Sequence, residues 1–296
     1  MTAWQRSYGR AGPWFAAPAL ALLAIFTLWP LLRASQLSVQ SSDLLHPSAG
    51  SWVGLGNYSD LLGDARFRRA FANTALFALL VVPLQCALAF LLALWVSRPG
   101  WGHRWLQLVF FLPTIVAMPV LAVVWSAVYQ PAVGGQMGLL NAVLSGLGVA
   151  SHAWLSEPTL ALPAIGFMSI WQGVGLQMMV FVAGLSAMPR EPLDAARVDG
   201  ANAWQRVRYV ILPALKSSWT FVVTVTTILS FRLFVQPYLM TRGGPGDSTL
   251  SLVQSIYEMT FVAQDLGRGC AASILLLAWV GLITLLLRGL AREESE

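Results

Sequence analysis

Long apolar stretches dominate this sequence and limit the folds that are open to it. A helix of about 20 apolar residues crosses the hydrocarbon core of a bilayer. Hydrophobic residues make up 57% of the chain and charged residues only 10%, whereas soluble domains carry about 25% charged residues. A core formed by 296 residues cannot hide that much apolar surface, so lipid must cover part of it. Six stretches are long enough to cross a bilayer, at about 12–34, 71–97, 104–129, 159–188, 215–237 and 269–289.

These stretches predict an all-α, polytopic membrane protein with about six transmembrane helices. Arg6 and Arg10 precede the first stretch, whose apolar run from Ala11 to Leu32 is longer than the hydrophobic region of a signal peptide. We therefore expect this stretch to remain uncleaved as the first transmembrane helix. The expected organisation is an N-terminal segment at 1–11, a transmembrane domain at 12–289 with a polar loop at 189–214, and a C-terminal tail at 290–296.

The distribution of Lys and Arg predicts the orientation. With the N-terminus in the cytoplasm, eleven of these residues fall on the cytoplasmic side, namely Arg6, Arg10, Arg98, Arg104, Arg190, Arg197, Arg206, Arg208, Lys216, Arg288 and Arg292. Six fall outside, namely Arg33, Arg66, Arg68, Arg69, Arg242 and Arg268. This excess follows the positive-inside rule and places both termini in the cytoplasm. Arg66, Arg68 and Arg69 run against the trend, and we expect them on an interfacial helix before the second stretch.

The charged and sulfur-containing residues argue against several other classes of protein. The net charge is +5, but the arginines cluster at the ends of apolar stretches, which favours a membrane surface over nucleic acid. Cys86 and Cys270 lie inside apolar stretches and match no metal or redox spacing, so they are interpreted as buried small hydrophobic residues. No metal site is predicted.

The sequence also lacks the residues that a membrane enzyme or an ATPase would need. It contains no His-Glu-x-x-His motif, and its three histidines fall in loops, so no catalytic residue is predicted. It contains no Gly-x-x-x-x-Gly-Lys-Ser/Thr motif for binding ATP. All thirteen Asp and Glu residues lie in loops or tails. A secondary solute transporter usually buries carboxylates to couple protons or sodium, so it remains only as an alternative.

Residues 191–213 form a polar segment between two apolar stretches and are the most informative part of the chain. Apolar residues recur there at mostly three- and four-residue spacings, which predicts helix. Gly200 interrupts the pattern and predicts two short helices joined at a bend. Glu191 and Asp194 suit a first helical turn, and Pro213 is expected to stop the second helix. Small residues such as Ala195 allow close approach of another surface. Physics alone leaves two interpretations open, an amphipathic helix resting on the membrane or a docking surface.

The same segment resembles the cytoplasmic EAA loop of ABC importer permeases, which docks on an ATPase subunit. The family pattern is Glu-Ala-Ala, three residues, Gly, and about nine residues to Ile-x-Leu-Pro. The matching residues are Asp194-Ala195-Ala196, Gly200 and Val210-Ile211-Leu212-Pro213, and Asp199-Gly200-Ala201 fits the Asp-Gly-Ala of the sugar-importing branch. Asp194 departs from the usual Glu and shortens the reach of the carboxylate, and Val207 stands where Phe is common. Glu191 is expected to take over part of that role.

Further motifs of the binding-protein-dependent carbohydrate branch, the maltose and glycerol-phosphate type, occur in the expected order. They are Gly54-Leu55-Gly56-Asn57-Tyr58, Asn73-Thr74, Phe111-Leu112-Pro113, Gly138-Leu139-Leu140-Asn141, Trp171-Gln172 with Gly175, and Thr241-Arg242-Gly243-Gly244-Pro245. Together they cover most of residues 53–275. The resemblance implies an all-α permease subunit, without a catalytic site, that moves a sugar inward by alternating access.

The resemblance also implies the partners, the location and the residues that couple to the ATPase. The partners would be an ABC ATPase dimer that binds ATP and Mg, a second homologous permease subunit and an extracytoplasmic solute-binding protein, with this chain binding no cofactor. The location would be the bacterial cytoplasmic (inner) membrane, as a multi-pass protein. The coupling residues would be Glu191, Asp194, Ala195, Ala196, Asp199, Gly200, Ala201, Trp204 and Pro213.

Polar groups inside the apolar stretches are the candidates for a solute path. Gln172 and Gln177 lie near the middle of the fourth stretch beside Trp171, and an aromatic face with amides suits a sugar. The alternative is that the glutamines hold helices together by hydrogen bonds. Arg232 either extends to the interface or faces the path with Gln236, where it would favour glycerol-phosphate-like anionic solutes.

Overall fold

A computed structural model describes residues 16–46, 50–98, 100–133 and 136–293. The expected N-terminal segment 1–11, with Arg6 and Arg10, lies outside the described residues, as do the last three residues of the expected tail. The described chain is almost entirely helical, which confirms the all-α prediction, and it divides into two compact units. The first contains residues 1–64 and 256–278, and the second contains residues 65–255 and 279–296.

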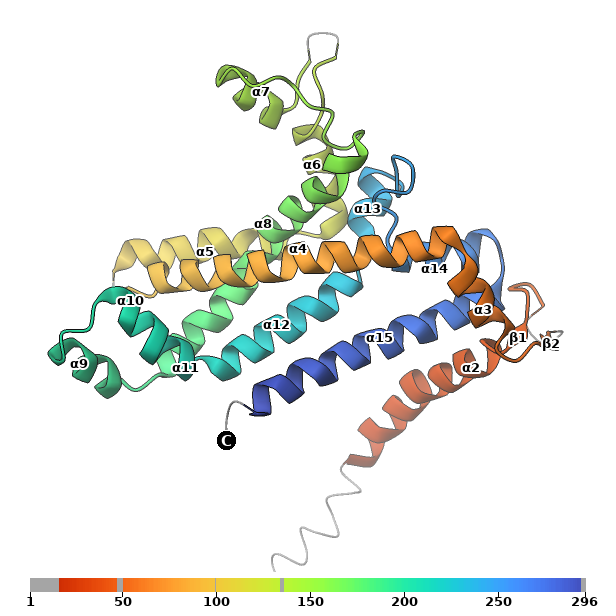
Figure 1. Cartoon of the computed structure of the whole chain (residues 1–296), viewed down its shortest axis with the longest axis horizontal. Helices are drawn as coiled ribbons and strands as arrows, with labels where there is room; N and C mark the ends of the chain where they lie inside the picture. Colours follow the sequence, from red (N-terminus) through yellow and green to blue (C-terminus); the bar gives the residue numbers. More distant parts are fainter. Residues whose placement is uncertain (1–15, 47–49, 99, 134–135, 294–296) are drawn as a thin grey trace, which may run out of the picture. The chain divides into compact units, whose positions relative to one another are not determined.

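Most of the long helices belong to the second unit (Figure 1). Its elements are α4 (Ala65–Val96), α5 (Trp101–Ile115), α6 (Met118–Val128), α7 (Leu139–Gly146), α8 (Pro158–Ala187), α9 (Glu191–Val198), α10 (Ala203–Arg206), η2 (Val207–Ile211), α11 (Leu212–Ala214), α12 (Lys216–Phe231) and α13 (Val235–Met240). Two further helices, α14 (Leu252–Tyr257) and α15 (Leu266–Glu293), run across the boundary between the units.

Five of the helical segments are long and apolar enough to cross a membrane, namely Ala16–Leu37, Ala65–Val96, Pro158–Ala187, Lys216–Met240 and Leu266–Gly289. A bent pair, α5 and α6, makes a sixth if it counts as one crossing. The boundaries differ from the expected ones most clearly at α4, which begins at Ala65 rather than at residue 71, and at α15, which continues to Glu293.

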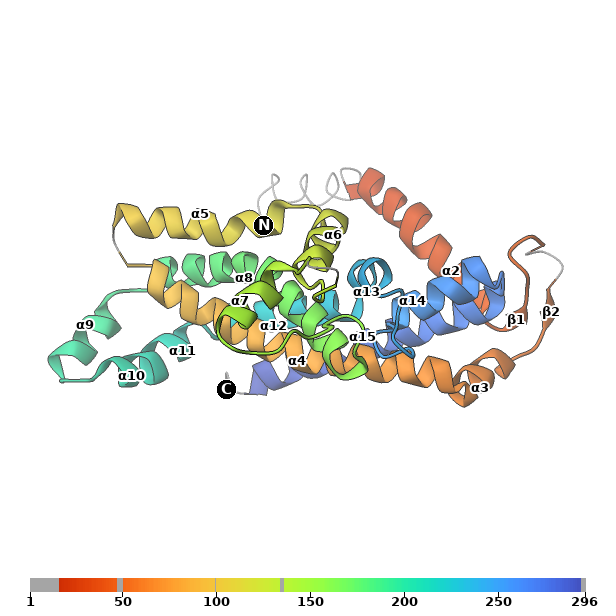
Figure 2. The same cartoon turned by 90° about the horizontal axis from the view of Figure 1, so that it is seen from above.

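The third apolar stretch is broken, whereas the sequence predicted one continuous span at 104–129. The helices α5 and α6 meet at 99°, and Val116 and Ala117 between them have extended backbone. Pro113 lies inside the last turn of α5 and proline occupies the first turn of α6. Proline lacks an N–H and clashes with the preceding turn, so two prolines six residues apart favour a break between them. Figure 2 shows α5 running along α8 while α6 turns away.

The core of the second unit lies between α4, α8 and α12. Ala89 and Ala93 of α4 are completely buried there, and a ring cluster of Phe90, Phe181 and Trp219 has centroids 4.9–5.5 Å apart. Because lipid is as apolar as leucine, close packing at small residues drives helix association in a membrane. The small residues Ala89 and Ala93, four positions apart on α4, pack in this way within the subunit.

The glycine at residue 175 marks a close approach of α5 and α8. A Cβ atom at Gly175 would overlap the carbonyl oxygen of Phe110 on α5 and lie 2.8 Å from Phe111 Cα. Thr114 Oγ1 donates a hydrogen bond of 2.9 Å to the carbonyl oxygen of Gln172 at the same crossing. The backbones of α5 and α8 are therefore in direct contact.

The arginines at the start of α4 correct one prediction from the sequence. Arg66, Arg68 and Arg69 lie in the first turn of α4 itself, not on a separate interfacial helix. Arg66 forms an ion pair with Asp247 at 3.3 Å, and Arg69 donates to the carbonyl oxygen of Gly246 at 3.0 Å. The guanidinium groups of Arg66 and Arg69 therefore bind the turn after α13.

The first unit is a small assembly around a two-stranded hairpin. Its elements are the helical segment Ala16–Leu37, which ends with η1 (Ala24–Leu28) and α2 (Trp29–Leu37), the strands β1 (Gln40–Ser41) and β2 (Ser51–Trp52), α3 (Gly56–Gly63) and η3 (Glu258–Val262). The strands are antiparallel with Gln40 opposite Trp52. Asn57 Nδ2 donates to the carbonyl oxygens of Ser38 and Gln40 at 2.9 Å each and fixes α3 to the hairpin.

Candidate functional site

The polar segment at 191–213 folds as the expected pair of short helices with a bend between them. The first is α9, and Gly200 follows it with φ +77°. The left-handed region is strained for any residue with a Cβ, so glycine is favoured there. Asn202 then caps α10 in a capping box, in which Gln205 N donates to Asn202 Oδ1 at 2.9 Å and Asn202 N donates to Gln205 Oε1 at 2.8 Å. The bend is therefore fixed by local chemistry alone.

The segment has one face attached to the protein and one face exposed. Val207, Ile211 and Leu212 pack against the core of α4, α8 and α12. On the other side, Val198 is 88% exposed and Trp204 is 70% exposed. Tyr209, 72% exposed, continues this apolar surface. Sequence reasoning identified Trp204 but missed Val198 and Tyr209, although a helical wheel that places Val207 and Ile211 inside would have put Tyr209 outside.

The remaining predicted coupling residues surround this exposed surface. Glu191 and Asp194 are exposed in the first turn of α9, and Asp194 forms an ion pair with Arg197 at 2.7 Å. A groove of about 350 Å³ opens between α9 and the following helices; it is lined by Ala196, Asp199, Gly200, Ala201, Gln205, Tyr209 and Val210. Ala195 is exposed beside it. Small side chains keep this groove open to another surface.

Pro213 does not end the second helix, which corrects the prediction from the sequence. The chain remains helical through η2 and α11, and Pro213 occupies the first turn of α11. The break comes at Leu215, before α12 begins at Lys216. The widened π-helical turn of η2 precedes the proline, and such a turn relieves the loss of the proline N–H.

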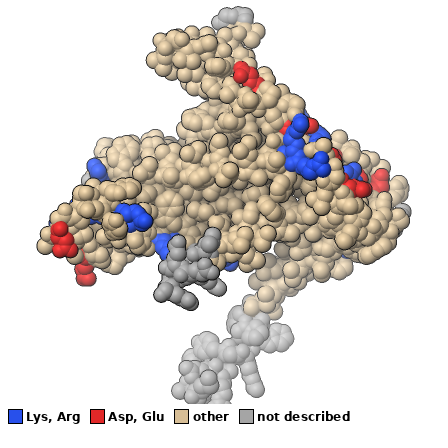
Figure 3. Space-filling view, in the orientation of Figure 1, with Lys and Arg blue, Asp and Glu red and all other residues tan. Residues whose placement is uncertain are grey.

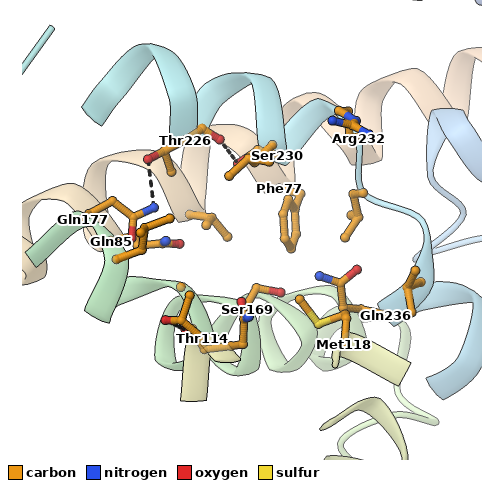
Figure 4. Close-up of a pocket in the computed structure, with 17 residues that line it drawn as sticks. Phe77, Gln85, Thr114, Met118, Ser169, Gln177, Thr226, Ser230, Arg232 and Gln236 are labelled. Carbon is orange, nitrogen blue, oxygen red and sulfur yellow. Dashed lines mark hydrogen bonds between the residues drawn. The ribbon is translucent and has the colours of Figure 1, made fainter. Parts of the chain in front are cut away.

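A cavity of about 500 Å³ lies between α4, α8 and α12 (Figure 4). Four of the five residues predicted for a solute path line it, namely Gln172, Gln177, Arg232 and Gln236. The lining also includes Phe77, Gln85, Thr114, Met118, Ser169, Thr226 and Ser230. The cavity therefore combines apolar walls with amide and hydroxyl groups from different helices.

Two buried amides, of Gln85 and Gln177, line one end of the cavity. Gln177 Nε2 donates to Thr226 Oγ1 at 3.1 Å, which joins α8 to α12. Gln177 Oε1 is buried and has no hydrogen-bond partner among the described residues. Gln85 lies against Gly173, where a Cβ would overlap its amide. The nitrogen of Gln177 thus joins two helices, as the helix-packing interpretation expects, whereas its role in a solute path stays a prediction.

Arg232 lies at the other end of the cavity, as Figure 4 shows. It ends α12, and the chain breaks there before α13 begins at Val235. A cation at a helix C-terminus is stabilised by the helix dipole. Among the described residues that line the cavity, Arg232 is the only charged one. Arg232 lines the cavity and is also exposed, so both alternatives for its side chain stay open.

Trp171 is not among the described residues that line the cavity. Its ring packs against Trp125 with centroids 5.3 Å apart, and its side chain is 41% exposed. Neighbouring helical residues point about 100° apart, and the Trp171 ring lies on the side of α8 that meets Trp125. Thr226 and Ser230 line the cavity instead and were missed, because hydroxyls in apolar helices also bond their own backbone carbonyls, as both do here.

Charged side chains are scarce on the long helices. In Figure 3 they form a few separate groups, and most of the visible surface carries none, as a surface in contact with lipid requires. Within the described residues, no group of three or more His, Cys, Asp and Glu side chains could hold a metal ion.

Comparisons with known proteins agree with this geometry. Residues 85–292 match the family described as binding-protein-dependent transport system inner membrane component. The probable ABC transporter permease protein YesP of Bacillus subtilis is 32% identical over 282 residues, which cover 94% of this chain and 89% of that protein. The alpha-glucoside transport system permease protein AglF of Rhizobium meliloti is 31% identical over 273 residues, 90% of this chain and 79% of that one.

A solved structure shares the fold. A chain of a bacterial alginate ABC transporter, in complex with an alginate pentasaccharide-bound periplasmic protein, superposes with a TM-score of 0.84 over 98% of both chains. The sequences are 19% identical, so the similarity concerns the fold alone.

Proposed function

The chain belongs to the family of inner membrane components of binding-protein-dependent transport systems and is the permease subunit of an ABC importer, and we propose that it moves a sugar through the cavity between α4, α8 and α12. It is not an enzyme; the ATPase is a separate subunit in such importers. The observation that carries the proposal is a membrane-embedded cavity of about 500 Å³ lined by amides, hydroxyls and an aromatic ring. Sugars need such hydrogen-bonding partners together with an aromatic or apolar face.

We further propose the assembly and its location. The chain works with a binding protein, as its family does. Its other proposed partners are an ATPase dimer that binds ATP and Mg, and a second permease of similar fold that completes the path. The assembly lies in the bacterial cytoplasmic membrane, with the 191–213 segment and both termini in the cytoplasm, in agreement with the distribution of Lys and Arg.

In this proposal the 191–213 segment transmits the movement of the ATPase to the helices around the cavity. Its exposed residues, Val198, Trp204 and Tyr209, would contact the ATPase, while Val207 and Ile211 are packed into the core beside α12. Shifting a gate from 1:99 to 99:1 requires about 5.5 kcal/mol. A rigid connection is needed to deliver that energy, and the capping box and the bend at Gly200 provide it.

The bend gives a direct test of this coupling. Gly200→Val should lower solute-stimulated ATPase activity of the assembled complex about five- to thirty-fold, because a left-handed residue with a Cβ costs about 1–2 kcal/mol. No atom lies within 4 Å of a Cβ at this position, so the effect comes from backbone strain and not from a clash.

Gly200→Asn is the matched control, because Asn adopts the left-handed region far more readily than Val. It should retain most of the stimulation. Equal stimulation in the wild type and in Gly200→Val would contradict the role of the bend.

The cavity residues give a separate test of the solute path. Gln172→Ala and Arg232→Ala should each lower solute uptake by reconstituted complexes about 5- to 150-fold, because removing a hydrogen bond to a bound solute costs about 1–3 kcal/mol. Uptake of labelled solute in proteoliposomes, with the binding protein present, is the measurement. Thr284→Ala on α15, where the hydroxyl bonds only its own helix, is the control and should not change uptake.

The same proteoliposomes also test two alternative functions, transport of an anionic solute and secondary transport without ATP. Arg232→Lys keeps the positive charge, so an anionic, glycerol-phosphate-like solute would be transported by this variant but not by Arg232→Gln. A secondary transporter would move its solute without ATP. Uptake that is independent of ATP, or unchanged uptake in both alanine variants at normal expression, would contradict the proposal.

A further inference from the structure

A second cavity of about 500 Å³ lies apart from the proposed solute path, where α4 ends and α5 begins. Its lining residues are Val96, Ser97, Arg98, Gly100, Trp101, His103, Arg104, Gln107, Val182 and Ser186. Ser186 lies in the last turn of α8, which leads directly into the 191–213 segment. The cavity is therefore at the end of the helix bundle that we propose to be cytoplasmic.

The cavity is positively charged and its charges are unpaired. Arg98 and Arg104 line it, whereas none of its described lining residues is Asp or Glu. Neither arginine has an ion pair or a hydrogen bond within the described part of the chain. Both side chains are exposed, and Ser97 lines the same cavity. Two guanidinium groups in one cavity form a donor set that binds a phosphate.

The start of α5 adds further donors to the same cavity. This helix of 15 residues begins after Gly100, and no side chain caps its N-terminus. Gly100, Trp101, His103 and Arg104 of this first turn all line the cavity. The backbone N–H groups of an uncapped first turn attract anions. In this protein they border the same cavity as Arg98 and Arg104. The contribution of the helix N-terminus thus adds to an existing basic cavity.

Exposed tryptophans indicate the depth of this cavity in the membrane. Trp101 is 76% exposed and Trp105 52% exposed, and their rings pack edge to face with centroids 5.7 Å apart. Trp95, 44% exposed, lies in the last turn of α4. Tryptophan is enriched at the level of the lipid headgroups, where its ring is apolar and its N–H is hydrated. A cavity beside these three rings therefore opens at headgroup depth.

From these observations we propose that the cavity between the end of α4 and the start of α5 binds the phosphate of an anionic phospholipid. Arg98 and Arg104 hold the phosphate, and the acyl chains lie along the apolar outer surface of α5, where Leu108, Val109 and Leu112 are exposed. Basic cavities at this depth on the cytoplasmic side are suited to anionic lipids. The bound lipid would lie next to the segment that couples to the ATPase.

The test is native mass spectrometry of the purified complex titrated with phosphatidylglycerol. The wild type should retain this lipid in preference to phosphatidylcholine. Each of Arg98→Ala and Arg104→Ala should weaken retention about fivefold, the effect expected for one basic residue near an anionic lipid surface. Arg288→Ala removes one exposed arginine from α15, outside the cavity, and should leave retention unchanged.

A second arm distinguishes lipid from soluble phosphate. Inorganic phosphate at millimolar concentration should not displace the lipid, because it lacks the acyl chains. Displacement by phosphate would mean that a soluble anion is the occupant and would overturn the lipid assignment. Equal retention of phosphatidylglycerol and phosphatidylcholine would overturn the site itself. So would a loss of retention in Arg288→Ala as large as that in Arg98→Ala and Arg104→Ala. None of these outcomes depends on the solute that the importer carries.

Discussion

Replacing Trp204 by Ala is expected to abolish coupling to the ATPase while the permease stays folded. Trp204 is 70% exposed on α10, so its ring is not part of the core. Exposed tryptophans that become buried at an interface are frequent hot spots, and truncating one costs about 2–4 kcal/mol. Affinity for the ATPase should therefore fall roughly 30- to 900-fold.

The measurement is co-purification of the ATPase with the tagged permease, followed by ATPase activity in the presence of solute and binding protein. Trp204→Phe should retain much of the affinity, since it keeps an aromatic ring. The matched control is Trp52→Ala, the same change at a 72% exposed tryptophan of β2, far from the 191–213 segment in sequence. Trp52→Ala should leave co-purification unchanged. Full co-purification with Trp204→Ala would show that this segment is not the docking surface.

The sequence was sufficient for features that depend on local chemistry. The apolar stretches predicted the long helices, because a single chain segment in lipid satisfies its backbone hydrogen bonds only when it is helical. Gly200 predicted the bend, since a left-handed residue after a helix favours glycine. Gln172 and Gln177 were predicted for the cavity because uncompensated amides are rare in apolar helices.

Features that depend on distant partners were not predictable in the same way. Arg66 binds Asp247, 181 residues away in sequence, and nothing near the arginine indicates that partner. Trp171 was assigned to the path because it is next to Gln172, but the direction of each side chain depends on where α8 meets α5. The break at residues 116–117 was not predicted from the sequence, because proline is tolerated in many transmembrane helices. Whether a proline kinks or breaks such a helix depends on the neighbouring helices.

The contact between α5 and α8 supports the second large effect, because Gly175→Val should separate these helices. Its Cβ would meet backbone atoms of Phe110 and Phe111, which cannot move aside as a flexible side chain could. Overpacking costs about 1–3 kcal/mol and more where backbone must shift, so the loss should exceed 3 kcal/mol. Separation would also break the hydrogen bond from Thr114 to the Gln172 carbonyl and distort the cavity that both residues line.

Thermal unfolding of the purified permease, followed by size-exclusion chromatography, measures this loss as a lower midpoint temperature and a lower yield. Gly281→Val is the matched control, because it puts the same β-branched residue into α15 where no atom lies within 4 Å of the new Cβ. The control removes the contribution of helix propensity, which is the same at both sites. A midpoint for Gly175→Val equal to that of Gly281→Val would mean that α5 is free to move away from α8. In that case the cavity could not depend on their contact, and Gln172 would have to be positioned by α4 and α12 alone.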